Sequence, residues 1–221
     1  MPDRLNFMLV LGLNTAFTAM EAALVRDGEI LADARETMAR GQDKALPGFV
    51  DRLLLQAGVT LAQLDRIAVV TGPGSFTGIR IGVAYARGLS LVTGVPCIGV
   101  TSLEAAIPPG MAGTVMAALA AQKRPPDQTW WVQGISADEG IAETVELGLE
   151  ALQSMLAGFH APVFMQNPDA LGEQAATLDL RPLVPSAVTA ALKAPLFDAE
   201  RHPPAPVYAR DPDATLPEPR K

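Results

Sequence analysis

Cysteine, aromatic residues and clustered basic residues are scarce in this chain of 221 residues. The single cysteine, Cys97, excludes an intramolecular disulfide framework, and its apolar neighbours indicate a buried structural thiol. The 17 lysines and arginines are scattered and the net charge is −7, which excludes tight nucleic-acid binding by this chain alone, because neutralising phosphates requires clustered basic residues. The sequence has no signal-peptide pattern and no apolar run of membrane-spanning length, so we expect a cytoplasmic protein without membrane contact.

Side chains that commonly take part in catalysis are also few. The only histidines, His160 and His202, are far in sequence from Ser75, so we expect no Ser-His-Asp site. Two histidines and Cys97 do not stand at ligand spacing, which argues against a zinc site. Asn14, at the end of the first apolar run, is a poorer magnesium ligand than a carboxylate. We therefore expect no catalytic residue and no metal site.

Apolar periodicity and turn signals predict an α/β fold with a mixed sheet flanked by helices. Three strands come first, and Asp27-Gly28 predicts a hairpin between the second and the third. The expected strands span residues 8–14, 20–25, 29–37, 66–70, 97–100, 114–120, 130–135 and 161–165. The expected helices span 46–57, 78–93, 146–159 and 186–193, with a short helix capped by Thr101-Ser102.

Proline-rich segments divide the sequence, which shows no internal repeat. Pro108-Pro109-Gly110 is the best domain boundary. It gives a first lobe of residues 1–108 and a second, less regular lobe of residues 109–202. Residues 203–221 are rich in proline and are expected to form an extended tail.

A glycine-rich turn, Gly72-Pro73-Gly74-Ser75-Phe76-Thr77-Gly78, separates a predicted strand from a predicted helix. Such turns can bind phosphate through backbone N–H groups, but this spacing is neither the dinucleotide fingerprint nor a Walker loop. The alternative, which we favour, is a tight turn with glycines where a side chain would clash. The residues that would contact a nucleotide or phosphate are Asn14, Thr15, Gly72, Gly74, Ser75, Thr77, Gly78 and Arg80.

The helix that follows, residues 78–93, is the stronger functional candidate. Glycines inside a helix cost up to about 1 kcal/mol each relative to alanine, and close approach of another helix is the usual gain. Apolar residues lie all around this helix, which predicts burial on both sides. One side would face its own sheet, and the other would face either a partner chain or the second lobe.

The glycine motif and the segments after it resemble the TsaB family, the bacterial partner subunit for making threonylcarbamoyladenosine in tRNA. The resemblance rests on residues 72–82, Gly88-Leu89, Gly94-Val95-Pro96 and Gly99-Val100-Thr101-Ser102-Leu103. The opening strand with Asn14-Thr15, the helix start at Leu46-Pro47 and the tail Val207-Tyr208-Ala209-Arg210 fit as well. The resemblance is strong over roughly residues 8–107 and weak over residues 110–200.

This resemblance implies the actin-like ATPase (ribonuclease-H-like) fold with two lobes, the second one divergent here. It implies a non-catalytic scaffold that pairs with a catalytic TsaD-type paralogue, joined by a TsaE-type ATPase, for threonylcarbamoyl transfer beside the tRNA anticodon. The chain would hold no cofactor of its own, ATP or ADP at the subunit junction would be held mainly by the partners, and tRNA would be contacted only indirectly. Helices 46–57 and 78–93 would join their counterparts in a four-helix bundle. The interface residues would be Leu46, Val50, Leu53, Ile79, Gly82, Val83, Tyr85, Ala86, Leu89 and Ser90.

Three departures from the family pattern stand out. Asn14 replaces the usual aspartate, which weakens the case for binding a metal–nucleotide complex. Gly41-Gln42-Asp43-Lys44 stands where the family usually has a histidine, and Ala121-Gln122-Lys123-Arg124 replaces a segment that commonly starts with aspartate. Three alternatives stay open: an active small-molecule kinase or ATPase of the same fold, a peptidase, and a self-pairing protein whose homodimer uses the same helices.

Overall fold

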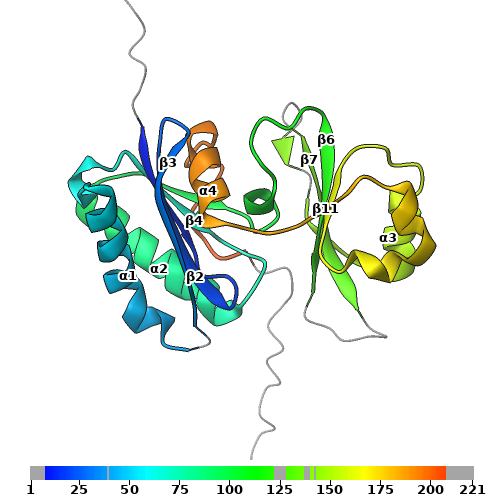
Figure 1. Ribbon diagram of the computed structural model, residues 1–221, viewed down its shortest axis with the longest axis horizontal. Coiled ribbons are helices and arrows are strands. Elements are labelled where there is room, and N and C mark those ends of the chain that lie inside the picture. The colour runs from blue at the N-terminus through cyan, green and yellow to red at the C-terminus, as the bar shows by residue number, and fades with distance from the viewer. Residues whose placement is uncertain (1–7, 39, 122–127, 137–139, 142, 208–221) are drawn as a thin grey trace, which may run out of the picture.

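The computed structural model describes residues 8–38, 40–121, 128–136, 140–141 and 143–207. These residues form two lobes, each built on a mixed β-sheet (Figure 1). The first sheet has the order β3-β2-β1-β4-β5. Its strands are β1 (Leu9–Asn14), β2 (Ala19–Arg26), β3 (Glu29–Thr37), β4 (Arg66–Val70) and β5 (Cys97–Val100).

Every residue of β1 is buried because helices cover both faces of the first sheet. α1 (Gln42–Ala57) and α2 (Phe76–Thr93) lie on one face, and α4 (Ala187–Lys193) lies on the other. β1 pairs antiparallel with β2 and parallel with β4, and β4 pairs parallel with β5. The predicted mixed sheet flanked by helices is confirmed.

α1 begins four residues earlier than the sequence predicts. Its first turn is closed by the N–H groups of Lys44 and Ala45, which both donate to the Gly41 carbonyl. Pro47 therefore lies inside the helix rather than at its start. Proline lacks the N–H that would bind the carbonyl of Asp43, and both residues are exposed, so water can satisfy that carbonyl.

The second sheet has the order β11-β10-β6-β7-β8, and β9 also pairs with β7. Residues 145–148 form a strand that pairs with residues 129–132. The helix predicted over 146–159 is therefore shorter than expected and begins only at Leu149. The strands are β6 (Thr114–Ala120), β7 (Thr129–Ser136), β8 (Gly140–Ile141), β9 (Val145–Gly148), β10 (Val163–Met165) and β11 (Leu180–Pro182), and the helix is α3 (Leu149–Leu156).

The two sheets repeat one topology although the sequence shows no repeat. In each lobe a central strand pairs antiparallel with the next strand of the chain and parallel with a later one, as β6 does with β7 and β10. Four 3₁₀ segments complete the described parts of the lobes, and the longest, η3, has a kink at Gly172. They are η1 (Leu61–Gln63), η2 (Glu104–Ala106), η3 (Pro168–Thr177) and η4 (Ala194–Leu196).

The chain returns to the first lobe after β11, which moves the boundary that the sequence suggested at residue 202. α4 packs on the first sheet, and the Arg66 guanidinium donates hydrogen bonds to the carbonyls of Ala194 and Phe197, both at 2.8 Å. Residues 203–207 lie along the same lobe, because the Val207 N–H donates to the Thr71 carbonyl at 2.8 Å. The rest of the predicted tail, residues 208–221, lies outside the described residues.

None of the helices in the described part of the chain is long and apolar enough to cross a membrane.

Candidate functional site

The glycine turn connects β4 to α2 and uses its own amides to start the helix. Ser75 is the N-cap of α2, and its Oγ accepts a hydrogen bond from the Gly78 N–H at 3.2 Å. The Ser75 N–H donates to the carbonyl of Ala16 at 2.7 Å. Two of the amides that would face a phosphate are therefore engaged within the protein.

The glycines of this turn allow close packing against the β1–β2 connection. A Cβ atom on Gly74 would clash with the carbonyl oxygen of Ala16, and one on Gly78 would clash with the carbonyl oxygen of Thr15. Gly72 has φ of 109° and would place a Cβ 2.7 Å from the carbonyl oxygen of Val207. The favoured alternative, glycines needed for a tight turn, accounts for all three positions.

Asn14 and Thr15 are buried and satisfied by the protein itself, contrary to a role in phosphate contact. The Asn14 Nδ2 donates to Glu21 Oε2 at 3.1 Å and to the Pro185 carbonyl at 3.2 Å, while its Oδ1 accepts from the Ala16 N–H at 3.1 Å. The Thr15 Oγ1 donates to the Gly78 carbonyl at 2.7 Å. Both side chains join the glycine turn and the lobe connection to the first sheet.

A cavity of about 730 Å³ lies beside this turn, between the β1–β2 connection and the start of α1. Ser75, Thr77 and Gly78 line it together with Phe17 and Gln42. Of the residues predicted to contact a nucleotide, these three are the ones that reach this cavity. Arg80 is exposed one turn further along α2, where its guanidinium stacks on the Phe76 ring at 3.8 Å.

Most of the predicted partner-interface residues face the interior of their own lobe, so that assignment needs correction. Gly82 is buried, and a Cβ there would clash with the Thr15 Oγ1. Ala86 is fully buried against the same core. The residues that the first lobe itself buries are Leu46, Val50, Leu53, Ile79, Gly82, Val83 and Ala86.

α2 does present a second, exposed face, which we call the outer stripe and define as Thr77, Arg80, Ala84, Gly88 and Leu91. These residues are all exposed and recur every three or four positions, which places them on one side of the helix. Leu91 is 86% exposed, and a Cβ on Gly88 would meet nothing within 4 Å. The helix is thus buried on one side only, and the outer stripe combines small residues with an exposed leucine.

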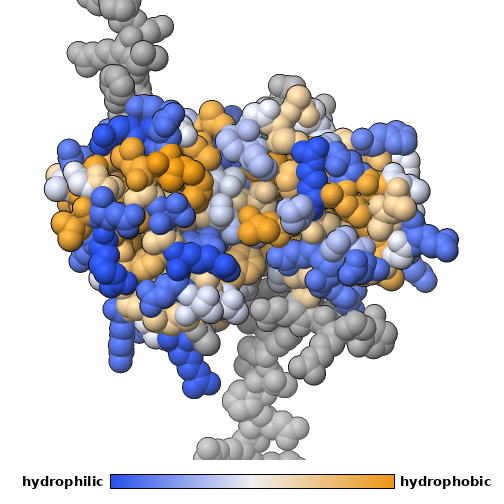
Figure 2. Space-filling view, in the orientation of Figure 1, coloured by the Kyte–Doolittle hydropathy of each residue, from blue (hydrophilic) through white to orange (hydrophobic). Residues whose placement is uncertain are grey.

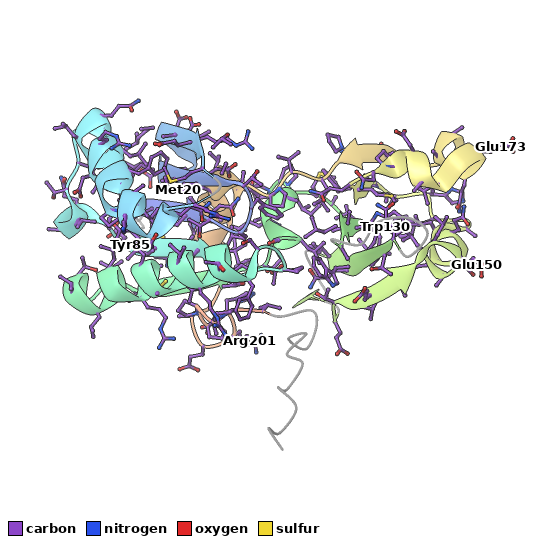
Figure 3. The ribbon with its side chains drawn as sticks, turned by 90° about the horizontal axis from the view of Figure 1, so that it is seen from below. Met20, Tyr85, Trp130, Glu150, Glu173 and Arg201 are labelled. Carbon is purple, nitrogen blue, oxygen red and sulfur yellow. The ribbon has the colours of Figure 1, made fainter. Side chains whose placement is uncertain are left out.

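A groove of about 510 Å³ runs between the outer stripe and α1, with Leu46 and Tyr85 in its wall. Tyr85 is half-buried there (Figure 3), and burial, followed by the charge of Asp51 in α1, raises the pKa of its hydroxyl to about 12. Of the other predicted interface residues, Leu89 is half-buried, and Ser90 donates from Oγ to the Val95 carbonyl at 2.6 Å.

Exposed apolar side chains are not confined to α2. Figure 2 shows separate hydrophobic patches among hydrophilic residues over both lobes. Ile30 of β3, Leu55 of α1 and Val184 are also well exposed. Exposure alone therefore does not mark an interface, and the regular spacing of small and apolar residues distinguishes the outer stripe. The sequence contained that spacing, but apolar residues on both faces of α2 concealed which face is buried.

The described residues contain no group of three or more His, Cys, Asp or Glu side chains placed to hold a metal ion. Cys97 is buried as predicted, and burial raises the pKa of its thiol to about 12 although Arg87 acts in the opposite direction. Such a thiol stays protonated at neutral pH and is a poor nucleophile.

Comparisons with curated proteins match less than half of this chain. The family of TsaD, tRNA N6-adenosine threonylcarbamoyltransferase, matches residues 34–124. The tRNA threonylcarbamoyladenosine biosynthesis protein TsaB of Escherichia coli is 38% identical over 96 residues, which cover 43% of this chain and 41% of that protein. The tRNA N6-adenosine threonylcarbamoyltransferase of Lawsonia intracellularis is 34% identical over 113 residues, covering 44% of this chain and 32% of that protein. The chain thus spans less than half the length of these two relatives.

Solved structures match both lobes. YeaZ from Pseudomonas aeruginosa, YeaZ being another name for TsaB, is 25% identical with a TM-score of 0.65, over 91% of this chain and 99% of that chain. The ROK hexokinase from Thermus thermophilus shares the fold at 16% identity, with a TM-score of 0.57 over 86% of this chain and 98% of that chain. The predicted actin-like ATPase fold is confirmed.

Proposed function

Starting from the confirmed resemblance to the TsaB family, we propose that this chain acts in tRNA threonylcarbamoyladenosine biosynthesis as a non-catalytic scaffold. In this role it pairs with a TsaD-type paralogue that transfers the threonylcarbamoyl group to the adenosine beside the anticodon. The observation that carries the proposal is the outer stripe of α2, which stays uncovered while the opposite face of the same helix is fully packed.

The chemistry of the outer stripe suits another helix. Ala84 and Gly88 lie one turn apart and are exposed, so a partner helix can approach the α2 backbone closely at this point. Leu91 follows one turn later and would lose its exposed apolar surface on pairing, at about 25 cal/mol for each Å² removed from water. The glycine at position 88 is otherwise unfavourable inside a helix, and close packing with a partner gives it a role.

The remaining parts of the proposal concern the wider assembly. A TsaE-type ATPase joins the pair, ATP or ADP at the junction is held mainly by the partners, and tRNA contact is indirect, in keeping with the net charge of −7. We place this assembly in the cytoplasm. The cavity beside Ser75 and Thr77 opens next to the outer stripe, which shares Thr77 with it, and so lies where a partner-held nucleotide could reach this chain.

The test compares two glycine substitutions that add the same side chain. Gly88→Leu places a leucine on the outer stripe, where its Cβ meets no other part of its own chain within 4 Å. Gly148→Leu is the matched control, because Gly148 is exposed in the second lobe, has φ of −75° and would likewise give a Cβ with nothing within 4 Å. Each variant is co-expressed with the TsaD paralogue of the same genome and analysed by size-exclusion chromatography with light scattering.

We expect a one-to-one complex for the original chain and for Gly148→Leu, and none for Gly88→Leu, although the isolated Gly88→Leu chain melts no lower than the original. Normal pairing by Gly88→Leu would show that α2 does not form the interface. A chain that ignores the paralogue and only pairs with itself would replace the scaffold proposal by the homodimer alternative.

A further inference from the structure

A second cavity, of about 650 Å³, lies where the two lobes join, beside the C-terminal end of α4. The proposed pairing does not use it. Its walls come from the connection between η2 and β6, from Val115 and Ile135 of the second sheet, and from the segment between Lys193 and His202. A molecule in this cavity would therefore contact both lobes.

Lys193 lines this cavity and is only 6% exposed. Its amine has no hydrogen bond and no ion pair with any residue in the described part of the chain. Burial lowers the pKa of this amine to about 8, and the charge of Glu104 acts in the opposite direction. The amine remains mostly protonated at pH 7, so the fold keeps a positive charge on a largely buried side chain that lines the cavity and has no direct partner in the described part of the chain.

Glu104, whose charge acts on Lys193, has its carboxylate bound to other groups. Glu104 is 1% exposed, and its Oε2 accepts a hydrogen bond from the Thr101 N–H at 2.7 Å. Its Oε1 has no hydrogen bond and lies 3.9 Å from the Nε2 of His202. The reciprocal hydrogen bonds between Thr101 and Glu104 thus fix the carboxylate beside His202 and leave the Lys193 amine to a further group.

Most of the remaining lining residues are apolar, and Arg201 adds a second cation. Ile107, Leu196 and Phe197 supply apolar wall, and Arg201 is exposed at the rim, on the segment below the first lobe in Figure 3. Lys193 and Arg201 against Glu104 leave one net positive charge around the cavity. Its volume lies within the usual range of small-molecule sites, about 300–1,000 Å³.

We propose that this cavity binds a small organic anion, whose carboxylate or phosphate group pairs with Lys193 and whose apolar body packs against Ile107 and Leu196. The anion completes the coordination of a buried amine that the protein leaves unpaired, and it neutralises the net charge of the cavity. This site is separate from the outer stripe of α2, so the proposal stands or fails independently of pairing with a paralogue.

Isothermal titration calorimetry of the full chain at pH 7 tests the site with three probes that share a phenyl ring: benzoate, phenyl phosphate and the neutral benzyl alcohol. Lys193→Met keeps most of the side-chain volume and removes the charge. Lys44→Met, on the exposed face of α1, is the matched control. We expect saturable binding of at least one anion, no binding of benzyl alcohol, at least tenfold weaker binding to Lys193→Met and unchanged binding to Lys44→Met.

A second measurement needs no variant. The full chain is acetylated briefly at pH 8 with and without the bound probe, and the modification of Lys193 and Lys44 is followed by mass spectrometry. Protection of Lys193 alone supports the site, also where Lys193→Met fails to fold. Tighter binding of benzoate would indicate that the natural ligand carries a carboxylate, and tighter binding of phenyl phosphate would indicate a phosphate ester. Absence of binding by both anions, equal binding to Lys193→Met, or acetylation of Lys193 that the probe leaves unchanged overturns the proposal.

Discussion

Two glycines of α2, Gly82 and Gly88, should respond in opposite ways to the same substitution. A Cβ on Gly82 would clash with Thr15 Oγ1, whereas a Cβ on Gly88 would meet nothing within 4 Å. Both positions lie inside the helix, so alanine improves the helix propensity equally at each, by about 1 kcal/mol. The difference between the two variants therefore measures packing between α2 and the β1–β2 connection.

The structure gives the direction and size of each effect. Gly88→Ala should raise the free energy of unfolding by about 1 kcal/mol, because propensity is the only change. Gly82→Ala must displace the Thr15 hydroxyl, which donates to the Gly78 carbonyl at 2.7 Å. Overpacking costs about 1–3 kcal/mol and the lost hydrogen bond about 1 kcal/mol, which together exceed the propensity gain. We expect Gly82→Ala to lower the free energy of unfolding by about 1–3 kcal/mol.

A double-mutant cycle identifies the atom responsible. Thr15→Ala alone removes a buried hydrogen bond and should destabilise by about 1 kcal/mol. It also removes the Oγ1 that a Cβ at position 82 would meet, and leaves the Thr15 Cβ at 3.5 Å, an ordinary contact. The double variant should therefore be more stable than the sum of the single effects predicts, by about 2–4 kcal/mol, because the overpacking is relieved and the hydrogen bond is lost only once.

Urea denaturation followed by far-ultraviolet circular dichroism measures all four chains, with Gly88→Ala as the control on the same helix. Stabilisation by Gly82→Ala equal to that by Gly88→Ala would refute the close contact. So would a cycle that is additive within about 0.5 kcal/mol, because contacting residues couple more strongly than that.

Two further predictions concern buried polar groups. Asn14→Asp should lower the free energy of unfolding by about 3 kcal/mol or more at pH 7, because it removes the donor to Glu21 and the Pro185 carbonyl and buries a carboxylate next to that of Glu21. Thermal melts at pH 7 and pH 5 check this, and the loss should be smaller at pH 5, because protonation of the new carboxylate restores a donor. The folded pKa of Cys97 is about 12 against an ordinary value of 9.0, so its contribution to stability should be lost as pH rises from about 9 to 12. Iodoacetamide at pH 8, followed by mass spectrometry, should label Cys97 in the folded chain at least tenfold more slowly than in the urea-unfolded chain. Equal rates would contradict the burial of the thiol.

Local patterns predicted most of the strands of this fold. The strands 29–37, 66–70, 97–100 and 114–120 match the observed bounds, because each is an uninterrupted alternating or apolar run between turn residues. The helix predicted over 146–159 failed at its start, where pairing with β7 took residues 145–148 into the sheet. Tertiary pairing overrode local propensity there, which periodicity alone does not reveal.

The faces of α2 could not be assigned from periodicity. Leu91 and Val92 are 86% and 84% exposed, while the small residues Gly82 and Ala86 are buried, which reverses the usual relation between side-chain size and burial. The reason is the close approach of Thr15 to α2, a contact between residues distant in sequence. The sequence analysis also missed the return of residues 187–207 to the first lobe. That return depends on contacts between residues distant in sequence, such as the hydrogen bonds from Arg66 to the carbonyls of Ala194 and Phe197.

Asn14 shows how one side chain bears on the choice between a scaffold and a kinase-like protein. Its amide donates to Glu21, and the Oε2 of Glu21 also accepts from the N–H of Ala187, at the start of α4. A second donation, to the Pro185 carbonyl, holds the segment that returns from the second lobe. An ionised carboxylate at this position could make neither donation, and it would repel Glu21. A magnesium-binding aspartate at position 14 would therefore be incompatible with the hydrogen bonds that fasten α4 to β1 and β2. Asn14, the residue that would weaken an ATPase, is thus also the residue that secures the segment returning from the second lobe.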